Sequence, residues 1–582
     1  MPSPVYILGT GLSHDGSAVL LKDGSVCFAI EKERVTRKKH DGGNDTAAIQ
    51  YCLDAEGITL DDITLVVQCA NFETPDRDRF RGIRLFAGRE NPPMITISHH
   101  LAHAYSAAGT CDFDECAILV IDGAGSPFEQ CVDTGTGELT PANLDVLHQT
   151  KLWCEKDSFY HFDGRRLHTL CKDFSEFDPP SGAEFSLQTT KHSIGGFYAS
   201  MSHYVFRNLD DVGKLMGLAP YGRSGQFDIQ ALEFTRGRLF VGEAWRSQFD
   251  NPSQGPEYFK EHFQYYADVA RWAQEEVERA VLACMKDRLD RFPHSQVCFS
   301  GGVALNAVAN ARLLNEGIVK DLYLEPAAGD NGLALGCAFY GWMEALRRDK
   351  VPHDGNTCFG KSYTSDEVAQ AVSQDTIHYT SRTLNDETLI LETAKRLAAG
   401  KTVGWFHGGA EFGPRALGHR SILGHPGIPG MGDHINSNIK FREDFRPFAP
   451  SVLPAYADTY FVSGRKSPYM ILVDRTREAY KEQLQNVTHV NGTARVQTVD
   501  ASWNPRYAAL LERFQAESGI AVLLNTSFNK RGMPIVETPE EAMALFEESA
   551  LDVLVLENVL IEKTRQTGNP AESSVEMNKI HH

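Results

Sequence analysis

Paired cysteines, long apolar runs and an excess of basic residues are all missing from this sequence. Its 12 cysteines contain no CxxC spacing, which excludes a zinc ribbon or a disulfide framework and predicts free thiols in a reducing compartment. No segment has the length of a membrane span or the pattern of a signal peptide. Because 57 lysines and arginines face 77 acidic residues, the net charge is -20 and disfavours nucleic acids and anionic membranes as partners. We therefore expect a cytoplasmic globular protein.

The length of 582 residues predicts two to four domains. A strand, a glycine-rich turn and a hairpin begin near Val5 and again near Cys116, where the second hairpin is expected over residues 129–137. A duplicated nucleotide-binding fold of the actin and sugar-kinase type would have this order, although coincidence is the alternative. We expect an α/β domain at 1–355, a linker at 356–380, an α+β domain at 381–563 and a disordered tail at 564–582.

Two histidines and two aspartates form the first candidate site. If residues 99–107 are helical, His99 and His103 lie on one face and can reach one ion. Asp122 follows a run that predicts a buried strand, and Asp330 follows another. Two imidazoles and two carboxylates suit iron(II) or zinc. The alternative is that both histidines are structural, because histidine pairs at helical spacing often are.

A second candidate site lies at Ser300-Gly301-Gly302, between a predicted strand and a helix. Backbone amides at such a helix start can hold phosphate, and glycine allows the ligand to come close. Tight packing of the helix against the strand would need the same glycines. Both interpretations stay open at this point.

The segment Gly355–Ser362 fits the Walker A spacing, but its context does not fit a P-loop. No buried strand precedes it, and the capping box Thr364–Glu367 starts the next helix beyond Lys361. We interpret the segment as a chance match within the linker.

The second domain carries basic residues within turns, in the runs 411–421 and 440–448 and at Arg495. Single arginines usually lie on surfaces. Here they occur among glycine, proline and aromatic residues, where guanidinium groups can converge on phosphate oxygens. In so acidic a chain, this convergence predicts a small anionic ligand.

In combination, these residues resemble the O-carbamoyltransferase family of natural-product biosynthesis, which includes the nodulation-factor, cephem and nebramycin-type enzymes. The resemblance spans residues 5–562. It implies an N-terminal domain with the actin-like ATPase fold, as in tRNA threonylcarbamoyl transferases, and an α+β, YrdC-like C-terminal domain. The matching motifs are His14-Asp15-Gly16, His99-x-x-x-His103, Asp122-Gly123, Lys214–Gly222, Phe299–Asn306, Gly329-Asp330-Asn331, Gly413–Gly418 and Asn525–Asn529.

The resemblance implies a two-step reaction that depends on ATP. Carbamoyl phosphate and magnesium-bound ATP would give carbamoyl adenylate in the C-terminal domain, with release of pyrophosphate and phosphate. The intermediate would pass inside the protein to the N-terminal domain, where a hydroxyl of an antibiotic or toxin takes the carbamoyl group and AMP leaves. Enclosure suits this chemistry, because water would destroy the mixed anhydride.

The same resemblance implies roles for individual residues. The metal site would use iron(II), or alternatively zinc, on His99, His103, Asp122 and Asp330. His14 and Lys39 match positions near the acceptor and the carbonyl, with His14 as the candidate base and Asp211 as a residue that positions substrate. The phosphate clamp would consist of Arg415, Lys440, Arg446, Arg495 and Ser527. The nucleotide contacts would be Lys214, Gly217, Gly301, Gly302, Asn306, Asn331 and Asn525.

Two other functions compete with this hypothesis. A tRNA threonylcarbamoyl transferase shares the N-terminal fold, but the net charge of -20 and the second domain disfavour it. A non-catalytic nucleotide-binding or metal-sensing protein would have no need of two phosphate sites. The sequence identifies neither the acceptor, whose pocket we expect within residues 150–260, nor the oligomeric state, which includes the option of a dimer.

Overall fold

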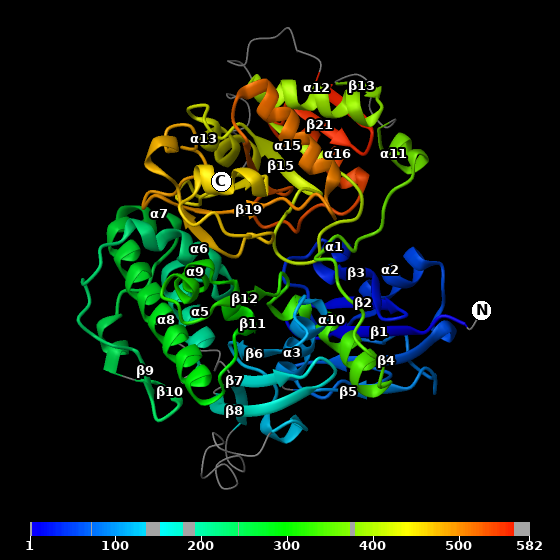
Figure 1. Ribbon diagram of the computed structural model, residues 1–582, viewed down its shortest axis with the longest axis vertical. Coiled ribbons are helices and arrows are strands. Elements are labelled where there is room, and N and C mark those ends of the chain that lie inside the picture. The colour runs from blue at the N-terminus through cyan, green and yellow to red at the C-terminus, as the bar shows by residue number, and fades with distance from the viewer. Residues whose placement is uncertain are drawn as a thin grey trace, which may run out of the picture.

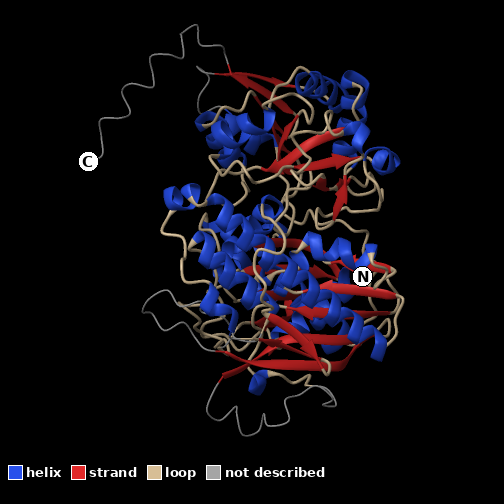
Figure 2. Cartoon of the chain, turned by 90° about the vertical axis from the view of Figure 1, so that its left-hand side faces the viewer, coloured by secondary structure: helices blue, strands red, loops and turns tan. Residues whose placement is uncertain are grey.

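The computed structural model describes residues 3–71, 73–134, 152–177, 193–242, 244–372 and 379–563. The chain forms two stacked parts, and the one built from the later residues lies above the other in Figure 1. Strands and helices alternate in both parts, as the side view in Figure 2 shows. The tail expected at 564–582 lies outside the described residues. No helix within the described ranges is long and apolar enough to cross a lipid bilayer.

The first sheet has the strand order β3-β2-β1-β4-β5. β1 pairs antiparallel with β2, which pairs antiparallel with β3, while β4 and β5 run parallel to β1. The expected hairpin is confirmed, since Asp23 and Gly24 both have positive φ in the turn between β2 and β3. The strands are β1 (Tyr6–Gly11), β2 (Ser17–Lys22), β3 (Ser25–Glu31), β4 (Ile63–Cys69) and β5 (Met94–Thr96).

The second sheet repeats this arrangement in the order β12-β11-β6-β7-β8. β6 pairs antiparallel with β7 and parallel with β11, as β1 does with β2 and β4. The internal repeat is therefore real, and the expected actin-like fold class is confirmed. The strands are β6 (Cys116–Ile121), β7 (Leu152–Phe162), β8 (Leu167–Phe177), β11 (Gln296–Ser300) and β12 (Asp321–Leu324).

The second hairpin is not where the sequence pattern predicted it. Phe128–Gln130 forms a 3-10 turn, residues 135–137 lie outside the described ranges, and the strands that pair with β6 begin only at Leu152. β7 and β8 cannot be recognised from a hydrophobic pattern, because they contain buried charged residues. Lys172 pairs with Glu155 at 2.5 Å and Lys156 pairs with Asp173 at 2.9 Å. Residues 150–260, where we expected only the acceptor pocket, thus contain two strands of 11 residues each.

Two helices fill the space between these sheets. α3 and α10 share one apolar core with strands of both sheets. The helices approach so closely that a Cβ on Gly336 would lie 1.7 Å from the carbonyl oxygen of Ala102. The helices of this part are α1 (Lys32–Thr36), α2 (Thr46–Glu56), α3 (His99–Thr110), α5 (Ile194–Phe206), α6 (Val212–Leu218), α7 (Pro256–Glu261), α8 (Phe263–Arg291), α9 (Ala307–Asn315) and α10 (Leu333–Phe339), beside the small hairpin of β9 (Leu232–Thr235) and β10 (Arg238–Val241).

The upper part contains a mixed sheet in the order β13-β22-β21-β14-β15-β20-β16-β19. One face packs against α12 and α15, and the other packs against α11, α13 and α16. The helices are α11 (Ser365–Val372), α12 (Asp386–Ala398), α13 (Met431–Ile435), α14 (Ala457–Tyr460), α15 (Pro505–Ser518) and α16 (Pro539–Glu548). The strands are β13 (Tyr379–Thr383), β14 (Val403–Phe406), β15 (Arg420–Gly424), β16 (Ala449–Val452), β19 (Gln497–Thr498), β20 (Val522–Ser527), β21 (Val553–Leu556) and β22 (Val559–Lys563), with β17 (Val473–Arg475) and β18 (Thr493–Arg495) in a separate ribbon.

The segment expected to be a linker contains the packed helix α11. Val368, Ala371 and Val372 belong to the core of the upper part. The capping box at Thr364 is present, since its hydroxyl accepts from the Glu367 amide and its own amide donates to the Glu367 carboxylate. Lys361 lies outside the helix and pairs with Glu367 at 3.1 Å. The Walker-like segment therefore lacks both the strand and the helix that a P-loop needs.

Candidate functional site

Four side chains converge at the start of α3. His99 Nε2 lies 2.8 Å from Asp122 Oδ2 and 3.3 Å from Asp330 Oδ1. His103 Nε2 lies 3.1 Å from His99 Nε2 and 3.4 Å from Asp122 Oδ2. All four residues are buried. α3 is covered on every side, Asp122 follows the buried strand β6, and Asp330 begins the short 3-10 turn that leads into α10. The structure thus brings together the residues that the sequence suggested as metal ligands, and it leaves His100 out.

The donor set fits a divalent cation. Two ligands about 2.1 Å from one ion and about 90° apart are separated by roughly 3 Å, which matches the distance between the two Nε2 atoms. Two neutral imidazoles and two carboxylates carry a net charge of -2, which one divalent ion would balance. The Nδ1 atoms of His99 and His103 have no hydrogen-bond partner among the described residues. The site therefore lacks the outer hydrogen bonds that often orient histidine ligands.

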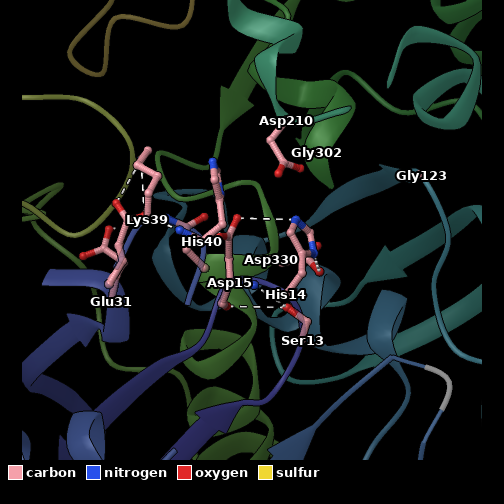
Figure 3. A network of polar contacts seen from close by, with 12 residues as sticks. Ser13, His14, Asp15, Glu31, Lys39, His40, Gly123, Asp210, Gly302 and Asp330 are labelled. Carbon is pink, nitrogen blue, oxygen red and sulfur yellow. Dashed lines mark hydrogen bonds and ion pairs between the residues drawn. The ribbon is translucent and has the colours of Figure 1, made fainter. Parts of the chain in front are cut away.

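His14 links this cluster to a chain of polar contacts (Figure 3). Its Nδ1 lies 3.0 Å from Asp330 Oδ2, and its Nε2 lies 3.5 Å from Asp15 Oδ2. His40 Nδ1 lies 2.8 Å from the other oxygen of Asp15. Burial would lower the pKa of His14, but the charge of Asp330 and its hydrogen bond outweigh burial and raise the pKa to about 10. Sequence reasoning missed Asp15 and His40, although both flank residues that it selected.

Lys39, Lys214 and Asp211 lie in the same region but are engaged with one another or with other carboxylates. Lys39 Nζ lies 3.0 Å from Glu33 Oε1, and Lys214 Nζ lies 2.7 Å from Asp211 Oδ2. Lys214 also lies 3.3 Å from Glu443 of the upper part. Both lysines line the central cavity described below. Their charges are therefore largely matched without a ligand, which makes them weaker candidates for phosphate contact than the upper arginines.

The two glycines after β11 are required by their surroundings. Gly301 has a φ of +88°, and a Cβ there would lie 2.3 Å from the carbonyl oxygen of Ile121. Gly302 lies beside Asp122, where its amide is 3.3 Å from Oδ1. Close packing against β6 thus explains Gly301, whereas Gly302 also lines the cavity.

The remaining residues that we assigned to nucleotide binding differ in how available they are. Asn306 accepts from the Ala309 amide as the cap of α9 and bonds Gln274, so its side chain is engaged. Gly217 contributes its carbonyl to His489 Nε2 and is not among the residues that line the cavity. Asn331 faces Glu31 at 3.4 Å, and Asn525 is buried with its Oδ1 unpartnered among the described residues. Asn331 and Asn525 both line the cavity.

In the upper part, Lys440 organises the start of a basic cluster. Its Nζ donates to the Ser527 carbonyl at 2.6 Å and lies 3.3 Å from the Ser527 hydroxyl. It also donates to the carbonyl and side-chain oxygens of Asn529, each at 2.9 Å. Burial lowers the pKa of Lys440 well below its usual value, and Arg442 and Arg446 lower it further. Lys440 therefore holds the end of β20 in place beside the arginines.

Arg415, Arg442 and Arg495 are the most informative members of this cluster. Within the described residues none of them forms an ion pair with a carboxylate, and Arg446 has only a long contact of 3.9 Å with Glu443. Burial, with Arg446 nearby, lowers the pKa of Arg415 to about 10 and that of Arg442 to about 9. Burial and the neighbouring arginines also lower the pKa of Arg495. Sequence reasoning overlooked Arg442, although it lies in the same run as Lys440 and Arg446.

One cavity of about 800 Å³ connects the two sets of residues. It lies between the two parts of the chain and is partly open to solvent. From the lower part it is lined by residues around the histidine and aspartate cluster, and from the upper part by the basic cluster. The lining includes His14, Asp122, Gly302, Asp330, Arg415, Lys440, Arg446, Arg495 and Ser527.

Beside this cavity, a buried ion pair of the lower part forms hydrogen bonds with a loop of the upper part. Arg34 Nε lies 2.9 Å from Glu31 Oε2, and both side chains are almost fully covered. Arg34 donates to the Gly413 carbonyl at 2.7 Å, while the Gly413 amide donates to Glu31 at 2.6 Å. Gly413 has a φ of +123°, which glycine adopts readily. The loop that carries Arg415 is thus positioned by residues that lie next to the histidine and aspartate cluster.

Comparisons with known proteins agree with this architecture. The family described as Carbamoyltransferase N-terminus matches residues 6–78 and 81–339, and the family described as Carbamoyltransferase C-terminus matches residues 394–563. The nodulation protein NolNO of Sinorhizobium fredii is 32% identical over 600 residues, covering 96% of this chain and 80% of that protein.

Two further relatives extend the comparison. The nodulation protein NolO of Bradyrhizobium diazoefficiens is 30% identical over 482 residues, covering 80% of this chain and 79% of that protein. The 3'-hydroxymethylcephem-O-carbamoyltransferase of Amycolatopsis lactamdurans is 27% identical over 577 residues, covering 93% of this chain and 96% of that enzyme. Both family matches and these relatives show that the chain is a transferase and belongs to the carbamoyltransferase family.

Proposed function

We propose that this protein is an ATP-dependent O-carbamoyltransferase that makes carbamoyl adenylate in its upper part and transfers the carbamoyl group to a hydroxyl of a small natural product. The observation that carries the proposal is the single cavity that holds an unpaired basic cluster at one end and an acidic, histidine-containing cluster at the other. We further propose that the reaction takes place in the cytoplasm, where ATP is available.

The basic cluster suits adenylate formation. Carbamoyl phosphate and ATP bring several phosphate charges, and Arg415, Arg442 and Arg495 form no ion pair with a carboxylate in the part of the chain that the structure describes. In a buried site, fixed cations stabilise charge that develops on phosphoryl oxygens without having to reorganise. Lys440 and Ser527 lie in contact and can bind the same anion as one unit. One water hydrolyses carbamoyl phosphate to phosphate and carbamate, and the carbamate oxygen then displaces pyrophosphate from the α-phosphorus of ATP. We assign both steps to this end of the cavity.

The other end suits transfer to the acceptor. Both ends belong to one cavity, so the adenylate can move between them without leaving the protein. A short path limits hydrolysis of the mixed anhydride. His14 lies between Asp330 and Asp15 and can hold a proton that leaves the acceptor hydroxyl. A divalent cation on His99, His103, Asp122 and Asp330, which we propose to be iron(II) or zinc, would polarise the adenylate phosphate and offset the Asp330 charge that keeps His14 protonated.

The first test omits the acceptor. The protein would be incubated with carbamoyl phosphate, ATP and magnesium while pyrophosphate and carbamoyl adenylate are measured. We expect both products. Formation of ADP without pyrophosphate would contradict the proposal and would indicate kinase chemistry instead.

The second test separates the two ends of the cavity. Asp122→Asn should abolish transfer to a hydroxyl acceptor and leave pyrophosphate formation within a few-fold of the wild-type rate. Asp54→Asn, on the exposed side of α2, serves as a matched control. Equal loss of both partial reactions in the Asp122 variant would contradict the assignment of separate sites.

A tRNA threonylcarbamoyl transferase stays as the alternative function. Binding of tRNA at physiological salt would favour it, since such binding depends on contacts with the phosphate backbone. The net charge of -20 leads us to expect no measurable binding.

A further inference from the structure

Three buried cysteines meet in the lower part, away from the cavity. Cys111 caps the end of α3, Cys116 begins β6, and Cys298 lies in β11. Their side chains are at most 1% exposed. The Sγ atoms of Cys116 and Cys298 are 3.6 Å apart, and all three Sγ atoms lie within 4.8 Å of one another. Three segments that are distant in sequence thus place three thiols around one point.

An ammonium group accompanies the thiols. Lys350 Nζ lies 3.4 Å from Cys111 Sγ, and it donates to the carbonyl oxygens of Cys111 at 2.7 Å and Phe113 at 3.2 Å. The thiols of Cys116 and Cys298, with Lys350, lower the pKa of Cys111 despite its burial. Apolar packing of cysteines does not require such an ammonium group beside the thiols.

We propose that Cys111, Cys116 and Cys298 form a binding site for a thiophilic d10 cation, Zn²⁺ or Cu⁺. Two sulfur ligands about 2.3 Å from a tetrahedral zinc ion lie roughly 3.7 Å apart, which matches the contact between Cys116 and Cys298. Binding replaces the thiol protons with the metal and releases them to solvent. Three thiolates and one divalent ion carry a net charge of -1, which Lys350 balances.

The position of this thiol site explains what the ion would do. α3, β6 and β11 each carry one of its cysteines, and each also leads to the cavity. α3 begins with His99, β6 ends before Asp122, and β11 ends before Gly301. The thiol site lies roughly 10–20 Å from those residues along each element. A bound ion would fix the relative positions of α3, β6 and β11. It would thereby hold the residues at the far ends of these elements in place relative to one another.

Cadmium tests the proposal, because it gives an absorption band when thiolates bind it. The full-length protein would be reduced under anaerobic conditions and titrated with Cd²⁺. We expect one equivalent to produce a thiolate-to-metal band, and we expect X-ray absorption of the zinc-loaded protein to show sulfur neighbours at about 2.3 Å. Competition with zinc and copper(I) chelators then distinguishes the two natural ions. Cadmium bound at the other candidate metal site, which has only histidine and carboxylate ligands, gives no such band.

Variants locate the site. Cys298→Ala and Cys111→Ala should lose the band, whereas Cys52→Ala and Cys284→Ala should keep it, because those two buried thiols lie outside the cluster. Near-ultraviolet circular dichroism reports whether each variant is folded. The absence of a band in the reduced wild-type protein would overturn the proposal without any variant. Persistence of the full band in Cys298→Ala, or formation of a Cys116–Cys298 disulfide with no metal uptake, would overturn it as well.

Discussion

The two parts of the molecule bury charge in opposite ways. In the β7–β8 hairpin every buried charge that we name has a partner, as Lys172 does in Glu155 and Lys156 does in Asp173. In the basic cluster of the upper part, Arg415, Arg442 and Arg495 form no ion pair within the described residues, and neighbouring arginines lower the pKa of Arg415 and Arg495. Paired charges cost little once they are formed, whereas like charges in a buried cluster repel. The hairpin therefore uses paired charges within its fold, whereas the like charges of the basic cluster repel one another, and the anionic ligand that we propose would relieve this repulsion.

The largest effect should come from breaking a pair in the hairpin. Lys172→Met leaves Glu155 and Asp133 buried without their partner, so the free energy of unfolding should fall by about 3–5 kcal/mol. Denaturant-induced unfolding measures the change. Lys286→Met is the control, since Lys286 is exposed on α8 and its pair with Asp290 should contribute little. A loss below about 1 kcal/mol for Lys172→Met would contradict this account of the hairpin.

The next effect concerns the basic cluster, where activity and stability should separate. Arg495→Met removes one repelling charge, so the free energy of unfolding should stay equal or rise. Pyrophosphate formation should fall by about 10²–10³-fold, because a buried donor to the reacting phosphates is lost. Arg513→Met, in the exposed pair with Glu517, is the matched control of the upper part. Full activity of the Arg495 variant would refute its place in the clamp.

Pyrophosphate should bind to the basic cluster and supply the negative charge that its arginines lack. At 100 times its dissociation constant it should stabilise the wild-type protein by about 2.7 kcal/mol, measured as a shift in thermal unfolding. For each variant, the stabilisation is measured against the same variant without pyrophosphate. At the same pyrophosphate concentration, Arg495→Met should be stabilised less than the wild type, and Lys172→Met should be stabilised as much as the wild type. Equal shifts in all three would place the anion outside the basic cluster.

Acid should affect the hairpin gradually. Lys172 outweighs the effect of burial and lowers the pKa of Glu155 to about 2. An unfolded glutamate titrates near 4.3, so the stabilisation is fully present above that pH and is lost as the pH falls toward about 2. The slope that one proton contributes is at most about 1.4 kcal/mol per pH unit. Glu155→Gln should remove this slope in unfolding experiments, and an unchanged slope would show that other carboxylates carry it.

The same contrast explains what the sequence could predict. α3 contains three histidines, so its helical structure could only be assumed when the spacing of His99 and His103 was considered. Period-based reasoning found the strand before Asp122, because all of its residues are apolar and buried. It missed β7 and β8, because their buried lysines and glutamates look solvent-exposed until their partners are known. The pairing depends on the register of two strands, which no local pattern contains.

The site shows a similar division. His99 and His103 could be selected by their spacing along one helix, and Asp122 and Asp330 by the strand-like runs before them. Resemblance to a family added His14. The contact between His40 and Asp15 could not be foreseen, because it depends on how the turn after β1 meets the chain beyond α1. Arg442 could have been found, since it lies two residues from Lys440. That Gly217 faces His489 rather than the cavity follows only from the packing of the two parts.

The grip of Glu31 and Arg34 on Gly413 limits how such enzymes can be recombined. A different lower part joined to this upper part would have to place a buried Glu–Arg pair at the same position. Otherwise the loop that carries Arg415 would lose the two hydrogen bonds at Gly413. Changes confined to the acceptor pocket avoid that penalty. Diversification of the acceptor within one chain should therefore proceed by point substitution more readily than by exchange of halves.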